Sequence, residues 1–360
     1  MPSANSVIVE IVMETKYIKV APQELNNLAE PAEAIRRGEL VAFPTETVYG
    51  LGADALNPDA VLSIFKAKGR PNDNPLIVHI ADPDMLRPLV AEIKPEVKKL
   101  LSAFWPGPLT IVLQKSPIVP MEVTAGLDTV AIRMPDHPIA LELIKRAGVP
   151  IAAPSANRSG KPSPTLAEHV MEDMAGRISW IIDGGPCRVG LESTVLDMTG
   201  DIPTILRPGG ITPEMIEQVA GMVRLDSGLI DGKSTEKPKS PGMKYTHYAP
   251  NGEVIVVSGE PEKVFRWINQ SVQKDEEAGK KVFVLAAAEH LSQYAIHCGI
   301  AFGAAESPEE IAMNIFRLFR DCDRLEADKI YVEAIPRAGI GLAVMNRLEK
   351  AAGGKIVKVE

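Results

Sequence analysis

The stretch from residue 41 to residue 79 constrains the fold of this chain more than any other. A short apolar run, residues 41–43, is halted by Pro44 and opens into the loop T-E-T-V-Y, which closes on Gly50 and Gly52. Because proline and glycine interrupt strands, this pattern predicts a buried strand that ends in a loop. Hydroxyl groups and glycines therefore collect where that strand ends.

A helix is predicted directly after this loop. Asn57 can cap it, Pro58 suits its first turn, and Gly69 can close it. The last turn and exit of the helix are basic, with Lys66, Lys68 and Arg70. Basic residues at the C-terminus of a helix either interact favourably with the helix dipole or bind an anionic ligand.

An apolar strand, residues 76–78, follows and ends on His79. We expect this strand to neighbour the strand at residues 41–43, so that two polar clusters meet at one edge of an α/β sheet. Ligands bind at such an edge. This placement favours the ligand interpretation of the basic residues.

Arg133 lies inside a predicted strand, residues 130–134. An arginine in an apolar strand is nearly always paired. The residues alone leave two interpretations: a structural salt bridge, or a receptor that binds a carboxylate with both arms of its fork.

The strand predicted at residues 151–153 leads into a loop rich in hydrogen-bond donors, S-A-N-R-S-G-K-P-S (155–163). The loop is either an ordinary polar turn or, with Lys161 among its hydroxyls, a cradle for phosphate. It is not a G-x-x-x-x-G-K-[ST] loop. Thr165 and Glu168 predict a capping box for the next helix.

Two further predicted strands have polar ends, at residues 192–194 and at Arg207. The residues at these strand ends show neither the Ser/His/Asp order of an acyl-transfer triad nor an H-E-x-x-H metal motif. The pattern favours a site that positions its substrates over one that attacks them with a nucleophile.

The composition suggests two domains and a reducing compartment. The chain has 360 residues, of which 45% are hydrophobic. Its three cysteines lack metal-ligand spacing, its apolar runs are too short to span a bilayer, and its N-terminus lacks the features of a signal peptide. We expect a cytoplasmic protein. The net charge of −8 argues against an extended nucleic-acid surface but allows a local groove for one anion.

From about residue 223 to Pro250 the sequence has the Asp, Gly, Ser, Lys and Pro content of a linker. Beyond it, strand and helix patterns alternate. Strands are predicted at residues 253–258, 281–286, 297–302, 329–334 and 355–359, with helices between them. Such alternation predicts a small, parallel, doubly wound sheet.

Five ordered motifs together resemble those of the threonylcarbamoyl-AMP synthase family. They are P-T-E-T-V-Y-G-L-G (44–52), K-G-R-P-N-D-N-P-L-I-V-H (68–79), W-P-G-P-L-T (105–110), P-S-A-N-R-S-G-K-P-S-P-T (154–165) and E-S-T-V-L (192–196), followed by H-Y-A-P (247–250). The resemblance covers nearly the whole chain. The chain looks like the long, two-domain form of the family.

The resemblance implies an α/β fold in three parts. Residues 1–222 would form a YrdC-like catalytic domain, a twisted mixed sheet with helices around a concave site. Residues 223–250 would form a linker that folds as a lid over the nucleotide. Residues 251–360 would form a smaller, Rossmann-like parallel domain.

The implied activity is that of an L-threonylcarbamoyladenylate synthase, a nucleotidyltransferase. It condenses L-threonine, bicarbonate and ATP into threonylcarbamoyl-AMP and pyrophosphate. The product would pass to the machinery that makes t6A at position 37 of tRNA. Mg²⁺ is expected on the phosphates, although no acidic metal motif is present.

The family pattern also implies the residues of the site. It places L-threonine against Thr47, His79, Arg133, Ala153 and Ser193. It places ATP against Arg70, Asn74, Thr129, Ser155, Ser163, Arg207 and Tyr245, with Lys68 as a further phosphate contact. No covalent catalytic residue is implied.

Two rival functions remain open at this stage. One is a YrdC-type module that binds double-stranded RNA without adenylating activity, and duplex binding with a steep salt dependence would distinguish it. The other is a carbamoyl-transfer enzyme of hydrogenase maturation. The second is disfavoured because three cysteines cannot build its zinc-finger segment.

Overall fold

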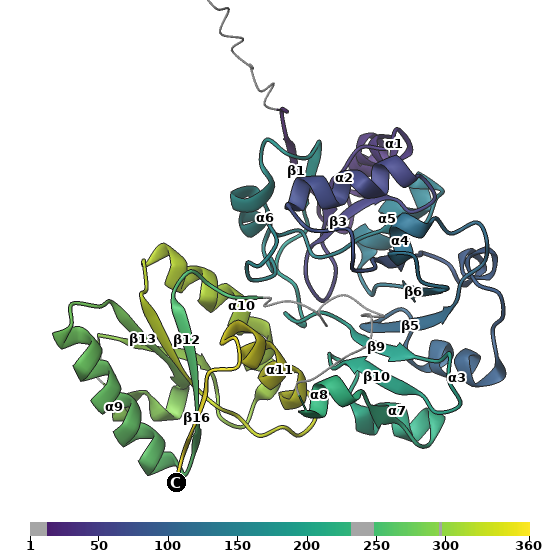
Figure 1. Cartoon of the computed structure of the whole chain (residues 1–360). Helices are drawn as coiled ribbons and strands as arrows, with labels where there is room; N and C mark the ends of the chain where they lie inside the picture. The colour runs from purple at the N-terminus through teal and green to yellow at the C-terminus, as the bar shows by residue number, and fades with distance from the viewer. Residues whose placement is uncertain (1–12, 232–247, 295–296) are drawn as a thin grey trace, which may run out of the picture.

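The computed structural model describes residues 13–231, 248–294 and 297–360. Over these residues it contains two β-sheets, an 11-stranded mixed sheet and a 5-stranded parallel sheet (Figure 1). The predicted combination of a mixed N-terminal sheet and a parallel C-terminal sheet is confirmed.

The large sheet has the strand order β1-β8-β2-β3-β7-β4-β6-β5-β9-β10-β11. Its strands are β1 (Lys16–Lys19), β2 (Val41–Phe43), β3 (Gly50–Asp54), β4 (Ile77–His79), β5 (Leu109–Gln114), β6 (Thr129–Arg133), β7 (Ile151–Ala152), β8 (Trp180–Asp183), β9 (Thr194–Asp197), β10 (Thr204–Arg207) and β11 (Arg224–Leu225). Parallel and antiparallel pairs alternate irregularly along the sheet, so strand ends of both polarities meet near its middle.

Helices cover this sheet and bury its apolar side chains. They are α1 (Ala29–Arg36), α2 (Pro58–Lys68), α3 (Pro95–Phe104), α4 (Met121–Thr124), α5 (Pro138–Ala147), α6 (Ala167–Met174) and α7 (Pro213–Ala220), with short 3₁₀ turns η1 (Leu25–Leu28), η2 (Pro83–Met85) and η3 (Arg87–Leu89). The core has two main clusters. One contains α2 and α3, and the other packs α1 and α5 against β2 and β8.

The helix predicted after the first loop is α2, and its ends follow the local sequence. The side chain of Asn57 accepts hydrogen bonds from the backbone of Asp59 and Ala60, and Gly69 ends the helix in a left-handed conformation at φ 63°. The capping box predicted from Thr165 is wrong, because α6 begins at Ala167 and Leu166 occupies its N-cap. The backbone N–H of Thr165 instead donates to the ring of His169.

The expectation that β2 and β4 are neighbours is also wrong. β3 and β7 lie between them. The loop after β2 turns the chain back so that β3 pairs with β2 in antiparallel fashion, and β3 and β4 then each pair with the two-residue β7. The polar clusters at the ends of β2 and β4 still line one pocket, described below.

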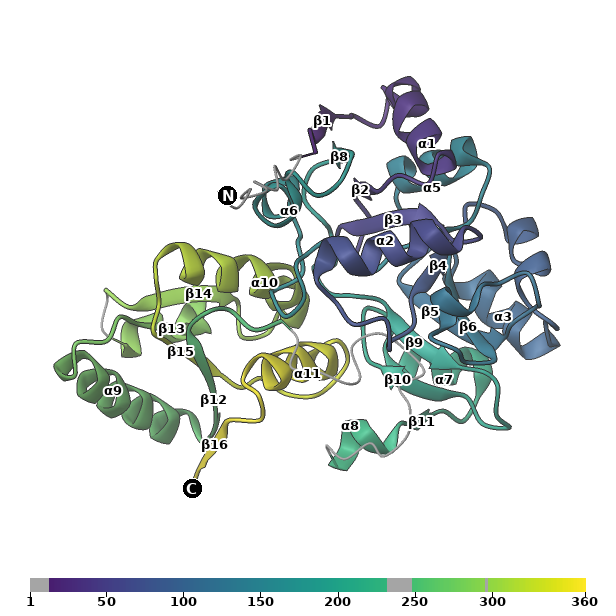
Figure 2. The ribbon, with the colours of Figure 1, turned by 45° about the horizontal axis from the view of Figure 1, so that its top comes forward.

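The C-terminal sheet has the strand order β14-β13-β15-β12-β16, and every pair in it is parallel. Its elements are β12 (Glu253–Gly259), α9 (Pro261–Glu277), β13 (Val282–Ala287), η4 (Ala288–Gln293), β14 (Gly299–Gly303), α10 (Pro308–Arg324), β15 (Lys329–Glu333), α11 (Gly341–Ala351) and β16 (Ile356–Val359). Helix α9 covers one face, and α10 and α11 cover the other, as Figure 2 shows.

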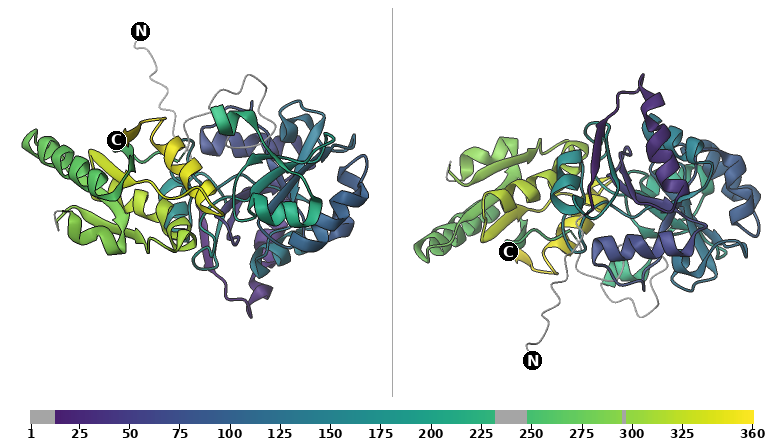
Figure 3. Two further views of the ribbon diagram at one scale, coloured as in Figure 1. Left: turned by 90° about the horizontal axis from the view of Figure 1, so that it is seen from below. Right: turned by 90° about the horizontal axis from the view of Figure 1, so that it is seen from above.

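Helices α10 and α11 pack between the C-terminal sheet and the large domain, and the two domains lie side by side in each view (Figures 1 to 3). Val48 and Leu191 of the large domain belong to the same apolar cluster as α10 and α11. Gly190 allows the closest approach, because a Cβ there would lie 2.4 Å from the Cα of Met313. The domains therefore share a packed interface.

The predicted linker begins with regular structure, β11 and then α8 (Ser227–Asp231). Residues 232–247 lie outside the described residues, so the lid and the three domain boundaries stay predictions. Within the described residues no helix has the length and apolar character needed to cross a membrane.

Candidate active site

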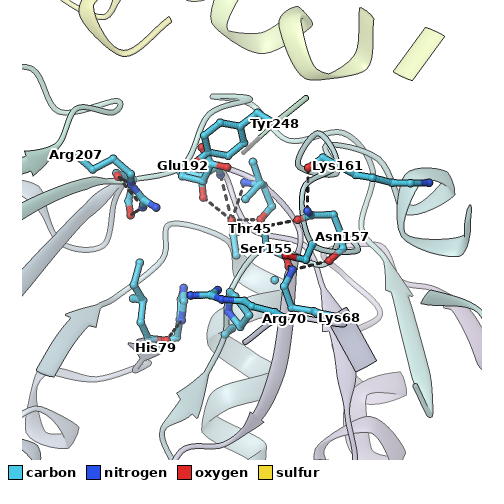
Figure 4. A pocket seen from close by; sticks show the side chains of 18 of the residues that line it. Thr45, Lys68, Arg70, His79, Ser155, Asn157, Lys161, Glu192, Arg207 and Tyr248 are labelled. Carbon is cyan, nitrogen blue, oxygen red and sulfur yellow. Dashed lines mark hydrogen bonds between the residues drawn. The ribbon is translucent and has the colours of Figure 1, made fainter. Parts of the chain in front are cut away.

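A pocket lies at the strand ends of the large sheet, on the side of the C-terminal helices (Figure 4). It is reached by the loops after β2 and β7, the residues before β9, the end of α2 and the ends of β4, β6 and β10. Its polar lining comprises Thr45, Thr47, Lys68, Arg70, His79, Arg133, Ser155, Asn157, Ser159, Lys161, Glu192, Ser193, Arg207 and Tyr248.

The structure brings most of the predicted residues together here. All five residues predicted to contact threonine line the pocket: Thr47, His79, Arg133, Ala153 and Ser193. Four of those predicted to contact ATP also line it: Lys68, Arg70, Ser155 and Arg207. Their roles remain predictions.

Three predicted ATP residues do not line this pocket. Asn74 is buried behind Arg70, whose guanidinium donates to the Asn74 carbonyl at 3.0 Å. Ser163 is buried and donates to Glu192. Thr129 begins β6, at the opposite end of that strand from Arg133. Tyr245 lies outside the described residues.

Arg133 combines both interpretations that its sequence context allowed. It is buried, and its Nη2 lies 2.6 Å from a carboxylate oxygen of Glu46, which makes a structural ion pair. Nη1 donates to the hydroxyl of Thr47 at 2.9 Å. However, among the described residues neither Nη2 nor the two Glu46 oxygens make a contact with hydrogen-bond geometry. Donor capacity of the guanidinium thus remains for a ligand.

His79 is a neutral group in this site. Burial, together with the positive charge of Arg133, lowers its pKa to about 3. Its Nδ1 lies 3.2 Å from the carbonyl oxygen of Ile77, so the proton of the neutral ring belongs on Nδ1. At neutral pH the ring therefore acts as a hydrogen-bonding group and adds no charge.

Arg207 and Ser193 form the opposite wall. The Nε and Nη2 of Arg207 donate to the Ser193 carbonyl at 3.0 and 2.9 Å, and Nη2 also donates to the Ser193 hydroxyl at 3.1 Å. That hydroxyl lies 2.7 Å from the hydroxyl of Thr110. Burial lowers the pKa of Arg207, because a desolvated cation is disfavoured.

Lys68 shapes the loop that was predicted to cradle phosphate. Its buried ammonium donates to the carbonyls of Ser155 and Asn157, the latter at 2.6 Å. The side chain of Asn157 in turn donates to the carbonyls of Arg158 and Lys161. Burial lowers the pKa of Lys68 well below its ordinary value, and the charge of Arg70 adds to this. A nearby anion would therefore stabilise its charged form.

Glu192 and Tyr248 line the pocket but were not predicted. Glu192 accepts from Ser163 and from Nε of Arg347, at 2.9 Å, on the C-terminal domain. The ring of Tyr248 lies 5.5 Å from the guanidinium carbon of the same arginine. Both residues stand inside motifs that carried the resemblance, E-S-T-V-L and H-Y-A-P, which was the signal available. Their common partner, Arg347, lies 155 positions from Glu192 in the sequence, so no local pattern predicts this contact.

Positively charged side chains surround Glu192, where the pocket meets the C-terminal domain. Burial and the neighbouring Arg347 and Arg207 lower the pKa of Lys350 to about 7. By contrast, burial would raise the pKa of Glu192, but Arg347 and Arg207 outweigh it and keep the pKa below its usual value. Cations thus outnumber this carboxylate, which suits an anionic ligand.

The described residues hold no group of three His, Cys, Asp or Glu side chains that could bind a metal. Glu192 lines the pocket and Glu46 lies beside it, and each of these carboxylates pairs with an arginine. These residues do not fit a dedicated Mg²⁺ site.

Two family models match the chain in sequence. One, described as telomere recombination and named for Sua5, YciO and YrdC, matches residues 33–209. The other, described as the C-terminal domain of threonylcarbamoyl-AMP synthase, matches residues 211–353. Together they cover all strands of the two sheets except β1 and β16.

Similar proteins agree with these models. A threonylcarbamoyl-AMP synthase of Pyrococcus abyssi is 54% identical over 90% of this chain and 94% of its own length. That of Bacillus subtilis is 51% identical over 96% of this chain and 100% of its own. The crystal structure of P. abyssi Sua5 complexed with L-threonine matches with a TM-score of 0.91 and 52% identity, covering 96% of this chain and 100% of that one. The chain belongs to the threonylcarbamoyl-AMP synthase family.

Proposed function

We propose that the pocket holds L-threonine and ATP side by side and condenses them with bicarbonate into threonylcarbamoyl-AMP, with release of pyrophosphate. The observation that carries this proposal is the buried Arg133, whose Nη2 retains donor capacity beside the hydroxyl of Thr47. Family membership and the threonine complex of the P. abyssi relative support it. A cytoplasmic location and transfer of the product to tRNA-modifying machinery remain predictions.

In this proposal the amino acid occupies the Arg133 side of the pocket. The guanidinium binds the threonine carboxylate, and Ser193 and the backbone of Ala153 complete the contact. Neutral His79 and the Thr47 hydroxyl lie close enough to Arg133 to bond the substrate hydroxyl. Because His79 carries no charge, it does not repel the substrate amine.

The nucleotide occupies the side formed by Arg70, the loop of residues 155–161 and Arg207. Hydrogen-bond donors of that loop and the positively charged side chains around it would stabilise the negative charge of the phosphates. Lys68 acts by holding the loop carbonyls in place. Asn74 and Ser163 support Arg70 and Glu192 from behind, and Thr129 and Tyr245 remain predicted ATP contacts.

Two bonds form in the reaction. The threonine amine bonds to the carbon of bicarbonate with loss of water, and a carbamate oxygen then bonds to the α-phosphorus of ATP as pyrophosphate leaves. The side chains that line the pocket hold anions close together and offset their charge. Positioning and charge stabilisation of this kind can supply much of the rate without a covalent intermediate. Mg²⁺, if it takes part, has no dedicated ligands among the described residues, so no step is assigned to it.

Pyrophosphate release, measured with each substrate omitted in turn, tests the function. Release should require threonine, bicarbonate and ATP together, because only the carbamate attacks ATP. Undiminished release without threonine would indicate an ordinary ATPase. Binding of duplex RNA with no ATP consumed would favour the rival RNA-binding function.

Substitution of Arg133 tests the amino-acid half of the site. Arg133→Ala should raise the KM for threonine by at least tenfold, because a charge-assisted hydrogen bond contributes about 1.5–3 kcal/mol. The KM for ATP should change much less. Arg133→Lys should restore little, since an ammonium has no fork. An equal rise in both constants would move Arg133 out of the amino-acid site.

A further inference from the structure

The C-terminal domain has a second pocket, far along the chain from the first. It lies at the carboxyl ends of β12 and β15. Its walls are Val257, Ser258, Gly259, Pro261, Val264, Phe265, His290, Glu333, Ala334, Ile335 and Pro336. None of these residues lines the pocket of the large domain.

This pocket lies at the topological switch point of the parallel sheet. β12 continues into α9, whose side chains cluster with Val257 and Tyr331 on one face. β15 leads to α11, which clusters with Val256 and Val332 on the other face. The two strands are neighbours, and the chain leaves them toward opposite faces of the sheet (Figure 2). The pocket is the crevice between these two connections. Ligands bind in such crevices in open α/β sheets.

A buried carboxylate forms the floor of the crevice. The side chain of Glu333 is only 7% exposed. It accepts hydrogen bonds from the hydroxyl of Tyr294 at 2.6 Å, the backbone N–H of Ala287 at 3.1 Å and Nδ1 of His290 at 2.9 Å. One oxygen accepts two of these bonds and the other accepts one, so a lone pair remains for a ligand.

Glu333 has no lysine or arginine partner among the described residues, and its sole ion-pair contact there is His290. Asp275, another buried carboxylate of this domain, shows the structural alternative. It is paired with both Lys280 and Lys329. Burial of a charge is costly unless it is compensated. Glu333 is compensated instead by its three hydrogen bonds, and the lone pair that they leave can accept from a ligand that brings donors.

The surroundings narrow the chemistry of that ligand. Phe265, Val264, Pro261, Ile335 and Pro336 are apolar, which suits a flat ring. His290 is the one titratable base among the lining residues, and Glu260 and Glu262 flank the start of α9. The lining offers a phosphate no lysine or arginine, and its carboxylate accepts N–H and O–H donors.

We propose that this crevice binds a small uncharged ring compound with N–H or O–H donors, of the nucleoside class, through Glu333 and His290. The ring lies against Phe265 and the proline walls. Its donors bond to the remaining lone pair of Glu333 and to the outer nitrogen of His290. The site is separate from the catalytic pocket and gives the C-terminal domain a ligand of its own.

Calorimetric titration of the full chain tests the proposal. The catalytic pocket is first saturated with L-threonine and a non-hydrolysable ATP analogue, and adenosine, guanosine, cytidine and uridine are then titrated separately. At least one nucleoside should bind with one-to-one stoichiometry. Its 5′-monophosphate should bind about tenfold or more weakly, since the site offers the phosphate acidic neighbours and no lysine or arginine.

Substitutions assign any binding to this crevice. Glu333→Gln and His290→Ala should each weaken the nucleoside by about tenfold or more, the loss expected for one charge-assisted hydrogen bond. His290 is partly exposed, so its removal threatens the fold less than that of Glu333. The control is Glu289→Gln, which removes an adjacent exposed carboxylate outside the pocket and should leave affinity unchanged.

Three results would overturn the proposal. The first is the absence of binding by all four nucleosides at millimolar concentrations. The second is binding that His290→Ala, shown by its thermal transition to be folded, leaves unchanged. The third is tighter binding of the monophosphate than of the nucleoside, which would contradict the charge argument.

Discussion

The C-terminal domain contacts the catalytic domain through two buried arginines, and their surroundings differ. Arg347 of α11 is fully buried, and all three of its guanidinium nitrogens have partners. It bonds the Glu192 carboxylate, the Pro208 carbonyl at 2.9 Å and the Glu192 carbonyl at 3.4 Å. Glu192 itself lines the catalytic pocket, so Arg347 holds a wall of the active site.

Arg320 of α10 lies at the edge of a larger charged cluster. Its Nη2 donates to Asp173 at 2.8 Å and to the Pro162 carbonyl at 2.6 Å, and its Nε is buried with no hydrogen-bond partner among the described residues. Asp173 also accepts from the Arg158 backbone and from Lys161. Arg320 therefore supports the loop of residues 155–163 through the Pro162 carbonyl and through Asp173.

The comparison shows that the second domain is a structural part of the active site. One arginine fixes the wall that includes Glu192 and Ser193, and the other supports the loop proposed to hold phosphate. If Arg347 is lost, Glu192 keeps the hydrogen bond from Ser163 and the neighbouring charge of Arg207, whereas Asp173 retains a direct ion pair with Lys161 if Arg320 is lost. We therefore expect unequal effects when each contact is broken.

The largest effect is expected for Arg347→Ala. Its removal leaves Glu192 buried with its closest cation gone, a change that costs about 3–5 kcal/mol of stability. Displacement of the pocket wall should also lower kcat/KM by about 100-fold. Urea unfolding and pyrophosphate release measure the two effects. The control is Arg337→Ala, because Arg337 pairs with Glu349 within the C-terminal domain and its side chain is half exposed. Comparable losses in both variants would refute a special role for Arg347.

A smaller effect is expected for Arg320→Ala. The substitution removes the bonds to Asp173 and to the Pro162 carbonyl, but Asp173 keeps Lys161 and the Arg158 backbone, so the loss should be about 2–3 kcal/mol. If the loop binds phosphate, the KM for ATP should rise more than the KM for threonine. Steady-state kinetics with each substrate varied would show this. A rise confined to threonine would contradict the assignment of the loop.

Lowering the pH should weaken both the Arg347–Glu192 contact and the Arg320–Asp173 contact. The pKa values of the two carboxylates determine the pH range. Burial would raise the pKa of Asp173, but bonds from Arg320 and the charge of Lys161 outweigh it and hold the pKa below its usual value of 3.8. The pKa of Glu192 is likewise held below its usual value of 4.5. A lowered folded pKa contributes stability at higher pH that is lost as pH falls through this range.

The dependence of unfolding free energy on pH can be measured for the natural chain, Glu192→Gln and Asp173→Asn. Each substitution should flatten the acid slope, because it removes one carboxylate whose protonation opposes folding. A slope that neither substitution changes would mean that other groups govern acid stability.

The smallest effect is expected for Arg324→Ala. Arg324 pairs with Glu172 at 2.6 Å beside Arg320, but both side chains are more than 40% exposed. Solvent screens such pairs, which contribute about 0.2–1 kcal/mol. Its unfolding midpoint should lie close to that of the natural chain, and kinetics should not change. A loss as large as that of Arg320→Ala would show that burial does not explain the difference.

Local sequence was informative where one element determines its own conformation. The cap at Asn57, the left-handed end at Gly69 and the alternating pattern of the parallel domain all follow from neighbouring residues. The motifs also placed hydroxyls and cations at strand ends that do meet. The capping box at Thr165 failed because a tertiary partner, His169, took the backbone donor that the cap would have used.

Thus the sequence by itself determined the kind of most elements, the family and most of the pocket lining, although β11 and α8 stand where it predicted only a linker. Tertiary structure alone decided that β3 and β7 separate β2 from β4, that Glu46 pairs with Arg133 and that Glu192 meets Arg347 across 155 positions. The physical reason is that periodicity and capping act over a few residues of chain. Strand order and the partner of a buried charge depend on which distant surfaces pack together, and no local pattern records that choice.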